Sequence, residues 1–134
     1  MLRVRWSVVS LICIGGLSAC GGNDGPPTTT INQGYPTVPS APVVKVEATN
    51  FKYSISALRA RPGEDLAIAL TSTKDTHDFV VDDGKLPVRV AIASEGVTAL
   101  GGLVAPQTPG TYAIYCSLLG HRGEGMQAEL IVAE

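Results

Sequence analysis

Short runs of alternating hydrophobic and polar residues occupy most of the chain from Val43 to its end. Four of them read VVKVEATN, DLAIALTS, GTYAIYC and QAELIVAE, and HDFVVDDG is predicted as a short strand that ends in a turn. Successive side chains of a β-strand point to opposite faces, so a period of two predicts strands. The turn-forming pairs Pro62-Gly63 and Pro109-Gly110 stand just before two of these runs and support that interpretation.

The stretch LPVRVAIASEGVTALGGLV, residues 86–104, fits more than one pattern. We predict two strands there, separated at Glu95-Gly96, because no window of the chain carries a helical stripe longer than about two turns. The whole pattern predicts an all-β protein, a Greek-key β-sandwich of about 7–8 antiparallel strands over residues 43–134.

The first twenty residues have a different character. Arg3 and Arg5 form a short positive region, the apolar run SVVSLICIGG follows, and LSAC then ends at Cys20. The apolar run is too short to cross a bilayer, so the pattern indicates a secretory signal. LSAC resembles a bacterial lipobox, which implies a lipoprotein signal peptide over residues 1–19 and lipidation of Cys20. An ordinary signal peptide cut near Ala19 is the alternative.

Residues 20–42 are rich in Pro, Gly and Thr and carry almost no apolar periodicity. Such a composition predicts a flexible tether between the lipid and the domain at residues 43–134. We therefore expect an exported protein, anchored to a bacterial membrane and facing the periplasm or the cell exterior. The net charge of −2 and the absence of a basic stretch argue against a nucleic-acid partner.

The cysteines leave one thiol without a partner. Of the three in the chain, Cys13 leaves with the signal peptide and Cys20 is the expected lipid site, so Cys116 cannot form a disulfide. A lone thiol in an oxidising compartment needs protection, which burial or a metal can supply.

Cys116 begins the segment CSLLGHRGEGM, in which His121 and Met126 follow at equal intervals of five. Each residue alone has an ordinary explanation, as a buried thiol, an exposed loop residue or a core side chain. Together they form a set of metal donors, and His77 is the only other imidazole that could complete it. A thiolate, two imidazoles and a weak thioether are the blue-copper ligand set, whereas zinc seldom uses Met.

The segment YCSLLGHRGEGM resembles the ligand loop of the cupredoxins, the plastocyanin and azurin family of blue copper proteins. The upstream stretch FKYSISALRARPGEDLAIALTSTKDTHDFVV is similar to the family's middle portion, so the resemblance covers residues 45–134. It implies a Greek-key sandwich with one type 1 copper ion near one end. His77, Cys116 and His121 would be the equatorial ligands, and Met126 the axial one.

Asp78 departs from the family, which commonly has Asn directly after the first ligand His. A carboxylate there could accept hydrogen bonds from the ligand loop and orient it. Its negative charge would then favour Cu(II) and lower the reduction potential. Alternatively, Asp78 faces solvent.

Four protein ligands leave no open position for a substrate, so we expect an electron carrier and not an enzyme. His121 is the expected electron port, with LLG and GLVAP as a small apolar docking patch. The expected partners are redox proteins such as cytochromes, oxidases or reductases, and the chain is expected to be a monomer. A copper carrier or storage protein, or a copper-free interaction module, are the alternatives.

Overall fold

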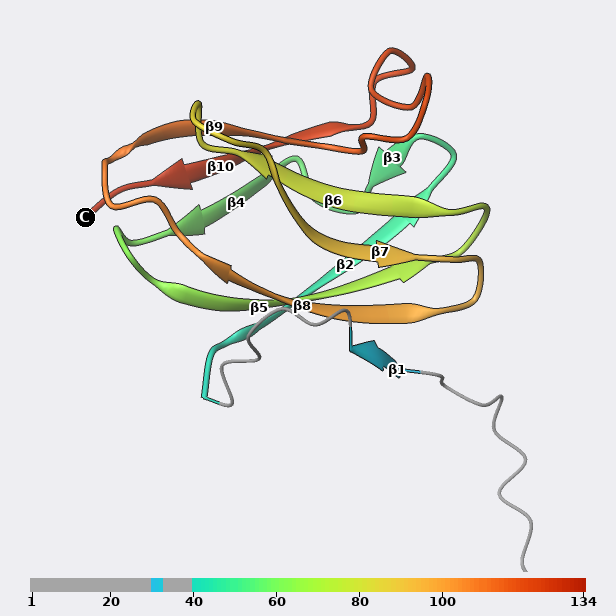
Figure 1. Ribbon diagram of the computed structural model, residues 1–134, viewed down its shortest axis with the longest axis horizontal. Helices are drawn as coiled ribbons and strands as arrows, with labels where there is room; N and C mark the ends of the chain where they lie inside the picture. The colour runs from blue at the N-terminus through green and yellow to red at the C-terminus, as the bar shows by residue number, and fades with distance from the viewer. Residues whose placement is uncertain (1–29, 33–39) are drawn as a thin grey trace, which may run out of the picture.

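The computed structural model describes residues 30–32 and 40–134, which form a sandwich of two β-sheets (Figure 1). Its strands are β1 (Thr30–Asn32), β2 (Val43–Thr49), β3 (Lys52–Tyr53), β4 (Ala57–Ala60), β5 (Asp65–Ser72), β6 (His77–Asp82), β7 (Val88–Ala93), β8 (Thr98–Val104), β9 (Gly110–Tyr115) and β10 (Gln127–Val132). One sheet has the order β1-β8-β5-β2-β3, and the other β4-β10-β9-β6-β7. No helix in this part of the chain is long and apolar enough to cross a membrane.

The four alternating runs correspond to β2, β5, β9 and β10, and HDFVVDDG corresponds to β6, as predicted. The ambiguous stretch also divides as predicted, into β7 and β8, with Glu95 and Gly96 between them. The signal peptide, Cys20 and most of the expected tether lie outside the described residues. Within residues 20–42, β1 pairs with β8, from Thr30 beside Thr98 to Asn32 beside Leu100.

The sandwich differs from the prediction in strand number and direction. The described residues form ten strands, nine of them within residues 43–134, where about 7–8 were predicted. The very short β1, β3 and β4 carry no alternating pattern long enough to recognise. The expectation of antiparallel pairing was wrong for three pairs, β1 with β8, β2 with β5 and β4 with β10, which are parallel. The physical reason lies in the connections: β4 belongs to the opposite sheet from β2 and β5, so the chain leaves one sheet and returns to it in the same direction.

Mostly aliphatic side chains from both sheets fill the space between them. The fully buried members with the largest side chains include Ile68, Leu70, Phe79, Ile114 and Leu130. Ile114 and Cys116 lie two residues apart and are both inaccessible to solvent. Side chains two residues apart project on the same face of a strand, so the Ile114 side chain and the Cys116 thiol both point into the core.

The two sheets approach each other closely where β8 passes β7. A Cβ atom placed on Gly101 would lie only 1.8 Å from the carbonyl oxygen of Val90. Only glycine fits at such a close approach of two backbones. Gly101 therefore allows the two sheets to close along this side.

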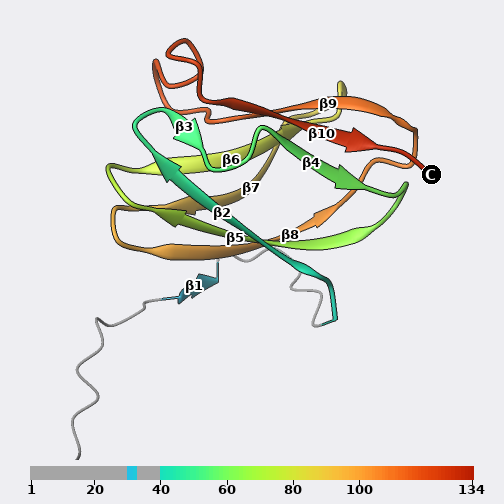
Figure 2. The ribbon, with the colours of Figure 1, turned by 180° about the vertical axis from the view of Figure 1, so that it is seen from behind.

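One end of the sandwich gathers the segments that carry the candidate ligands. β6 runs antiparallel to β9, with Val80 beside Tyr115, so the start of β6 lies next to the loop that follows β9. The same loop leads into β10, and β3 lies at the same end of the molecule in both views (Figures 1 and 2). His77 and residues 116–126 are therefore neighbours although they are far apart in the sequence.

Candidate metal centre

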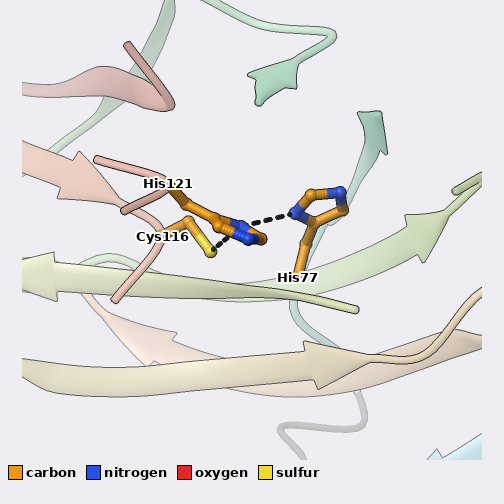
Figure 3. A group of neighbouring side chains, drawn as sticks. All are labelled: His77, Cys116 and His121. Carbon is orange, nitrogen blue, oxygen red and sulfur yellow. Dashed lines mark hydrogen bonds between the residues drawn. The ribbon is translucent and has the colours of Figure 1, made fainter. Parts of the chain in front are cut away.

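Three of the four predicted ligands converge at this end of the sandwich (Figure 3). The ligand atoms of His77, Cys116 and His121 all lie within 4.8 Å of one another. The Nδ1 atoms of the two histidines are 3.2 Å apart, and the Cys116 sulfur lies 3.4 Å from Nδ1 of His121. Two imidazole nitrogens and a sulfur thus face a common point, as a trigonal metal site requires.

Met126, the fourth predicted ligand, is completely buried and belongs to the same cluster of side chains as Cys116. Its backbone is hydrogen-bonded to the backbones of the other two candidate ligands in the loop, Cys116 and His121. The amide of Cys116 donates to the carbonyl oxygen of Met126 at 3.2 Å, and the amide of Met126 donates to that of His121 at 3.1 Å. Backbone hydrogen bonds alone therefore fold the loop back onto its own beginning.

Two glycines make this tight fold possible. Gly120 and Gly125 have φ angles of 86° and 96°, in the left-handed region that side chains with a Cβ rarely adopt. Between them, the amide of Glu124 donates to the carbonyl oxygen of Gly120 at 3.0 Å. The glycines of the segment GHRGEGM are thus turn residues that present His121 toward Cys116.

Burial favours the uncharged forms of two candidate ligands, His77 and Cys116. Desolvation, and then the neighbouring His121 ring, lowers the pKa of His77 below its ordinary value. Desolvation also raises the pKa of the Cys116 thiol. His77 therefore offers a neutral nitrogen, while the thiol must release its proton when a metal binds.

The donor set fits copper better than it fits zinc. Thiolate and thioether sulfur suit Cu(I), imidazole suits both copper states, and structural zinc sites prefer several cysteines. Within the described residues Cys116 is the single free thiol, and it is buried. The Nε2 atom of His77 is also buried and has no hydrogen-bond partner there, so Nδ1 is the ring nitrogen that faces the other donors.

Asp78 is fully buried, so the alternative in which it faces solvent is wrong. One carboxylate oxygen accepts a 2.7 Å hydrogen bond from the amide of Ser117, and the other accepts a 2.6 Å bond from the Ser117 hydroxyl. Ser117 directly follows Cys116. The carboxylate that follows the first histidine therefore holds the start of the ligand loop, as the first interpretation expected.

Tyr53, to which the sequence assigned no role, supports the same strand. Its hydroxyl donates to the carbonyl oxygen of Asp78, and its ring lies edge-on to Phe79 at 5.5 Å. The residue sits on β3, a strand too short to be recognised from its pattern. Only the packing of β3 near β6 reveals this contact.

Phe51 is a second residue that the sequence analysis missed. Its ring lies edge-on to His121, with ring centroids 4.9 Å apart, and its φ angle is 61°. A bulky residue in the left-handed region is uncommon, and such strained residues cluster at functional sites. The strained turn between β2 and β3 therefore places an aromatic ring against the half-buried His121.

The expected docking patch is divided between the two ends of the molecule. Leu119 is fully exposed in the ligand loop. Val104, within GLVAP, pairs with Asp65 at the start of β5, whereas the end of β5 leads toward His77. GLVAP therefore lies at the opposite end of the sandwich, and its assignment to a patch around the ligand loop was wrong.

We expect the alkaline stability of the protein to depend on Tyr53. Burial, followed by the charges of Cys116 and Asp78, raises the pKa of Tyr53 well above its ordinary value of 10.0. Above pH 10 the unfolded chain loses this proton and the folded chain keeps it, so the free energy of unfolding falls by up to about 1.4 kcal/mol per pH unit.

Replacing Tyr53 with Phe removes this part of the pH dependence and costs about 1 kcal/mol at neutral pH through the lost hydrogen bond. Denaturant titrations between pH 7 and pH 11 check both effects. Tyr112→Phe is a matched control, because the Tyr112 hydroxyl donates to Thr108 in an exposed position. If the free energy of unfolding fell equally with pH above pH 10 in the wild type and in Tyr53→Phe, the expectation would be contradicted.

One protein family matches the second half of the chain. The family model of the sulfocyanin (SoxE) domain matches residues 69–134, which include all four candidate ligands. No curated protein sequence matches the chain.

Solved structures of auracyanins share the fold. The dithionite-reduced auracyanin from the photosynthetic bacterium Roseiflexus castenholzii matches with a TM-score of 0.59 and 20% identity, over 70% of this chain and 98% of its own. Auracyanin B matches with a TM-score of 0.60 and 17% identity, over 70% and 90%. Auracyanin A from Chloroflexus aurantiacus, described as a blue copper protein, matches with a TM-score of 0.58 and 16% identity, over 68% and 98%.

The resemblance seen in the sequence, the sandwich fold and the family match agree. The match to the sulfocyanin domain ends with the last residue of the chain, so it contains the whole ligand loop and both strands that flank it. Residues 69–134 thus match the sulfocyanin domain, and the chain has the cupredoxin fold with a set of donors that fits one type 1 copper ion.

Proposed function

We propose that His77, Cys116 and His121 are the equatorial copper ligands, that Met126 is the axial ligand, and that the protein carries single electrons. The observation that carries this proposal is the convergence of two Nδ1 atoms and one sulfur within 4.8 Å, where the ligand loop meets the start of β6. Copper in such a site supplies a one-electron Cu(I)/Cu(II) couple. The protein supplies the geometry and tunes the potential.

The burial of the ligands favours electron transfer over catalysis. His77, Cys116 and Met126 are at most 1% exposed, so these three side chains offer no approach for a substrate. Catalytic metal sites keep an open position, which four protein ligands would fill. The backbone bonds of the loop also hold the ligands in place, which limits rearrangement when the charge of the metal changes.

His121 is the ligand through which electrons would enter and leave. It is half-buried, whereas the other three candidate ligands are buried. Phe51 lies against its ring, and the fully exposed Leu119 lies two residues before it. A small apolar surface of this kind suits the brief encounters of redox proteins, which bury less area than stable complexes.

We further propose that the protein works as a monomer at a bacterial membrane, facing the periplasm or the cell exterior. A signal peptide over residues 1–19, a lipid on Cys20 and a tether over residues 20–42 would hold the copper domain near its partners. Those partners would be redox proteins such as cytochromes, oxidases or reductases. Mass spectrometry of the mature protein, purified from membranes, tests the lipid on Cys20.

The experiment that tests electron transfer is addition of one equivalent of Cu(II) to the purified protein, followed by repeated reduction and oxidation. We expect an intense blue colour that bleaches on reduction and returns fully on oxidation, with one copper retained per chain. Metal analysis after each cycle provides the measurement. Loss of copper on reduction would support a copper carrier, and a colourless protein without bound copper would support a copper-free interaction module.

A further inference from the structure

We propose that Arg89 sets the reduction potential of the copper site by neutralising the buried carboxylate of Asp78. This inference rests on the proposed function, since it concerns the tuning of the same site. Arg89 lies outside the candidate ligands and outside the ligand loop, on β7. It would act on the copper through its positive charge, which balances that of Asp78, and not as a ligand.

The contacts of the Asp78 carboxylate form a closed network of three side chains. The Nε atom of Arg89 donates to Oδ2 of Asp78 at 2.9 Å, in an ion pair whose side chains are 49% and 0% exposed. A terminal nitrogen of Arg89 also donates to the Ser117 hydroxyl at 3.3 Å. With the two bonds from Ser117 to Asp78, the guanidinium and the loop serine share one carboxylate.

A β-bulge places Arg89 on the correct face of the sheet. Asp78 pairs with Ile92 on β7, but the register shifts between Phe79 and Val80, so that Val80 pairs with Arg89. Asp78 and Val80 are two residues apart on β6, so their side chains project on the same face of the sheet. Arg89 projects on that face as well, because directly paired residues share a face. Without the extra residue, Arg89 would project on the opposite face, because a slip of one residue exchanges the two faces.

The shared face is the outer one of this sheet. Phe79 and Val81 belong to the core cluster, which fixes the opposite direction for Asp78 and Val80. Asp78 is nevertheless fully buried, whereas Arg89 itself is half exposed. The carboxylate therefore lies beneath the guanidinium and the ligand loop, where an unpaired negative charge would be expensive.

The charge of Asp78 matters for the copper because of its position. Asp78 adjoins His77 in the sequence and is hydrogen-bonded to the residue after Cys116. An unpaired negative charge there stabilises Cu(II) relative to Cu(I), since charges interact strongly away from water. The positive charge of Arg89 opposes this effect, so the pair braces the loop with little net charge.

The test is a double-mutant cycle in the copper-loaded protein with Arg89→Gln, Asp78→Asn and both together. Reduction potentials from voltammetry and visible spectra are the readouts. At a fixed electrode potential, Arg89→Gln is expected to raise the ratio of Cu(II) to Cu(I) about tenfold, a shift of about 59 mV for one electron. Asp78→Asn is expected to lower that ratio, and the double variant to return within about threefold of the wild type.

Three further variants separate charge from structure. Arg89→Lys keeps the positive charge but loses the forked donor, so its potential is expected to stay near that of the wild type. Arg61→Gln makes the same charge change at the other end of the sandwich, near the pairing of Ala60 with Val132, and is expected to leave the potential unchanged. Ser117→Ala removes one donor to Asp78 without changing any charge.

If the role of Arg89 were purely structural, Arg89→Gln would lower the melting temperature of the copper-free protein. Its ratio of Cu(II) to Cu(I) at the fixed electrode potential would stay within about twofold of the wild-type ratio. That result would overturn the inference, and so would a double variant whose ratio stays as far from that of the wild type as the ratio of Arg89→Gln. A wild type that binds copper and cycles reversibly keeps the proposed function in either case. A wild type that binds no copper overturns the inference and the proposed function together.

Discussion

Replacement of Cys116 by Ser abolishes the intense blue colour of the copper-loaded protein and lowers its copper affinity by at least about a hundredfold, as loss of a soft ligand to copper implies. The colour arises from charge transfer between a thiolate sulfur and Cu(II). A serine hydroxyl is a harder donor and stays protonated near neutral pH, so it cannot replace the sulfur. The fold should remain, because the substitution changes one buried atom.

Visible absorption during titration with Cu(II), together with a competition titration against a chelator, measures both effects. Met126→Leu is the matched control, because it changes another buried side chain of the same loop at nearly constant volume. Since the axial thioether binds weakly, this control should stay blue and change mainly its reduction potential. A blue Cys116→Ser protein would refute the assignment of the sulfur as a ligand.

The second large effect is on folding, and we expect it for Gly101→Ala. The new Cβ would meet the carbonyl oxygen of Val90 at 1.8 Å and the Val90 side chain at 3.1 Å. A backbone oxygen between two paired sheets cannot move aside without separating β7 from β8. The expected loss in the free energy of unfolding is about 3 kcal/mol or more, the upper range for overpacking a core.

Thermal unfolding of the copper-free protein measures this loss, which corresponds to a decrease in melting temperature of about 12 °C or more for a domain of this size. Gly110→Ala is a matched control in another strand. Its added Cβ would meet only the Tyr112 ring, at an ordinary 3.6 Å. Similar melting temperatures for the two alanine variants would show that the close approach of the sheets is not tight.

The longer strands could be predicted because their alternation is a local property of the sequence. Short strands such as β3 and β4 leave too few positions for a pattern, and their place depends on what they pack against. The convergence of His77 with Cys116 and His121 could also be anticipated, since the donor set pointed to one metal. Their roles as ligands remain predictions that the Cys116 variant tests.

The burial of Asp78 could not be predicted from the sequence, because it depends on a register shift. Alternation along β6 puts Asp78 on the outer face, where a carboxylate ordinarily meets water. The bulge that brings Arg89 over it has no mark in the segment VRVAIA. The contact between Phe51 and His121 was hidden for a similar reason, since it depends on a strained turn between two other strands.

The backbone hydrogen bonds that close the ligand loop bear on the order of events when the protein is made. They join main-chain atoms of Cys116, His121 and Met126, so the loop acquires its shape as the chain folds. Metal delivery can then follow folding as a separate step, wherever the finished protein resides. The supply of copper, and not the rate of folding, would then decide how much of the protein becomes active.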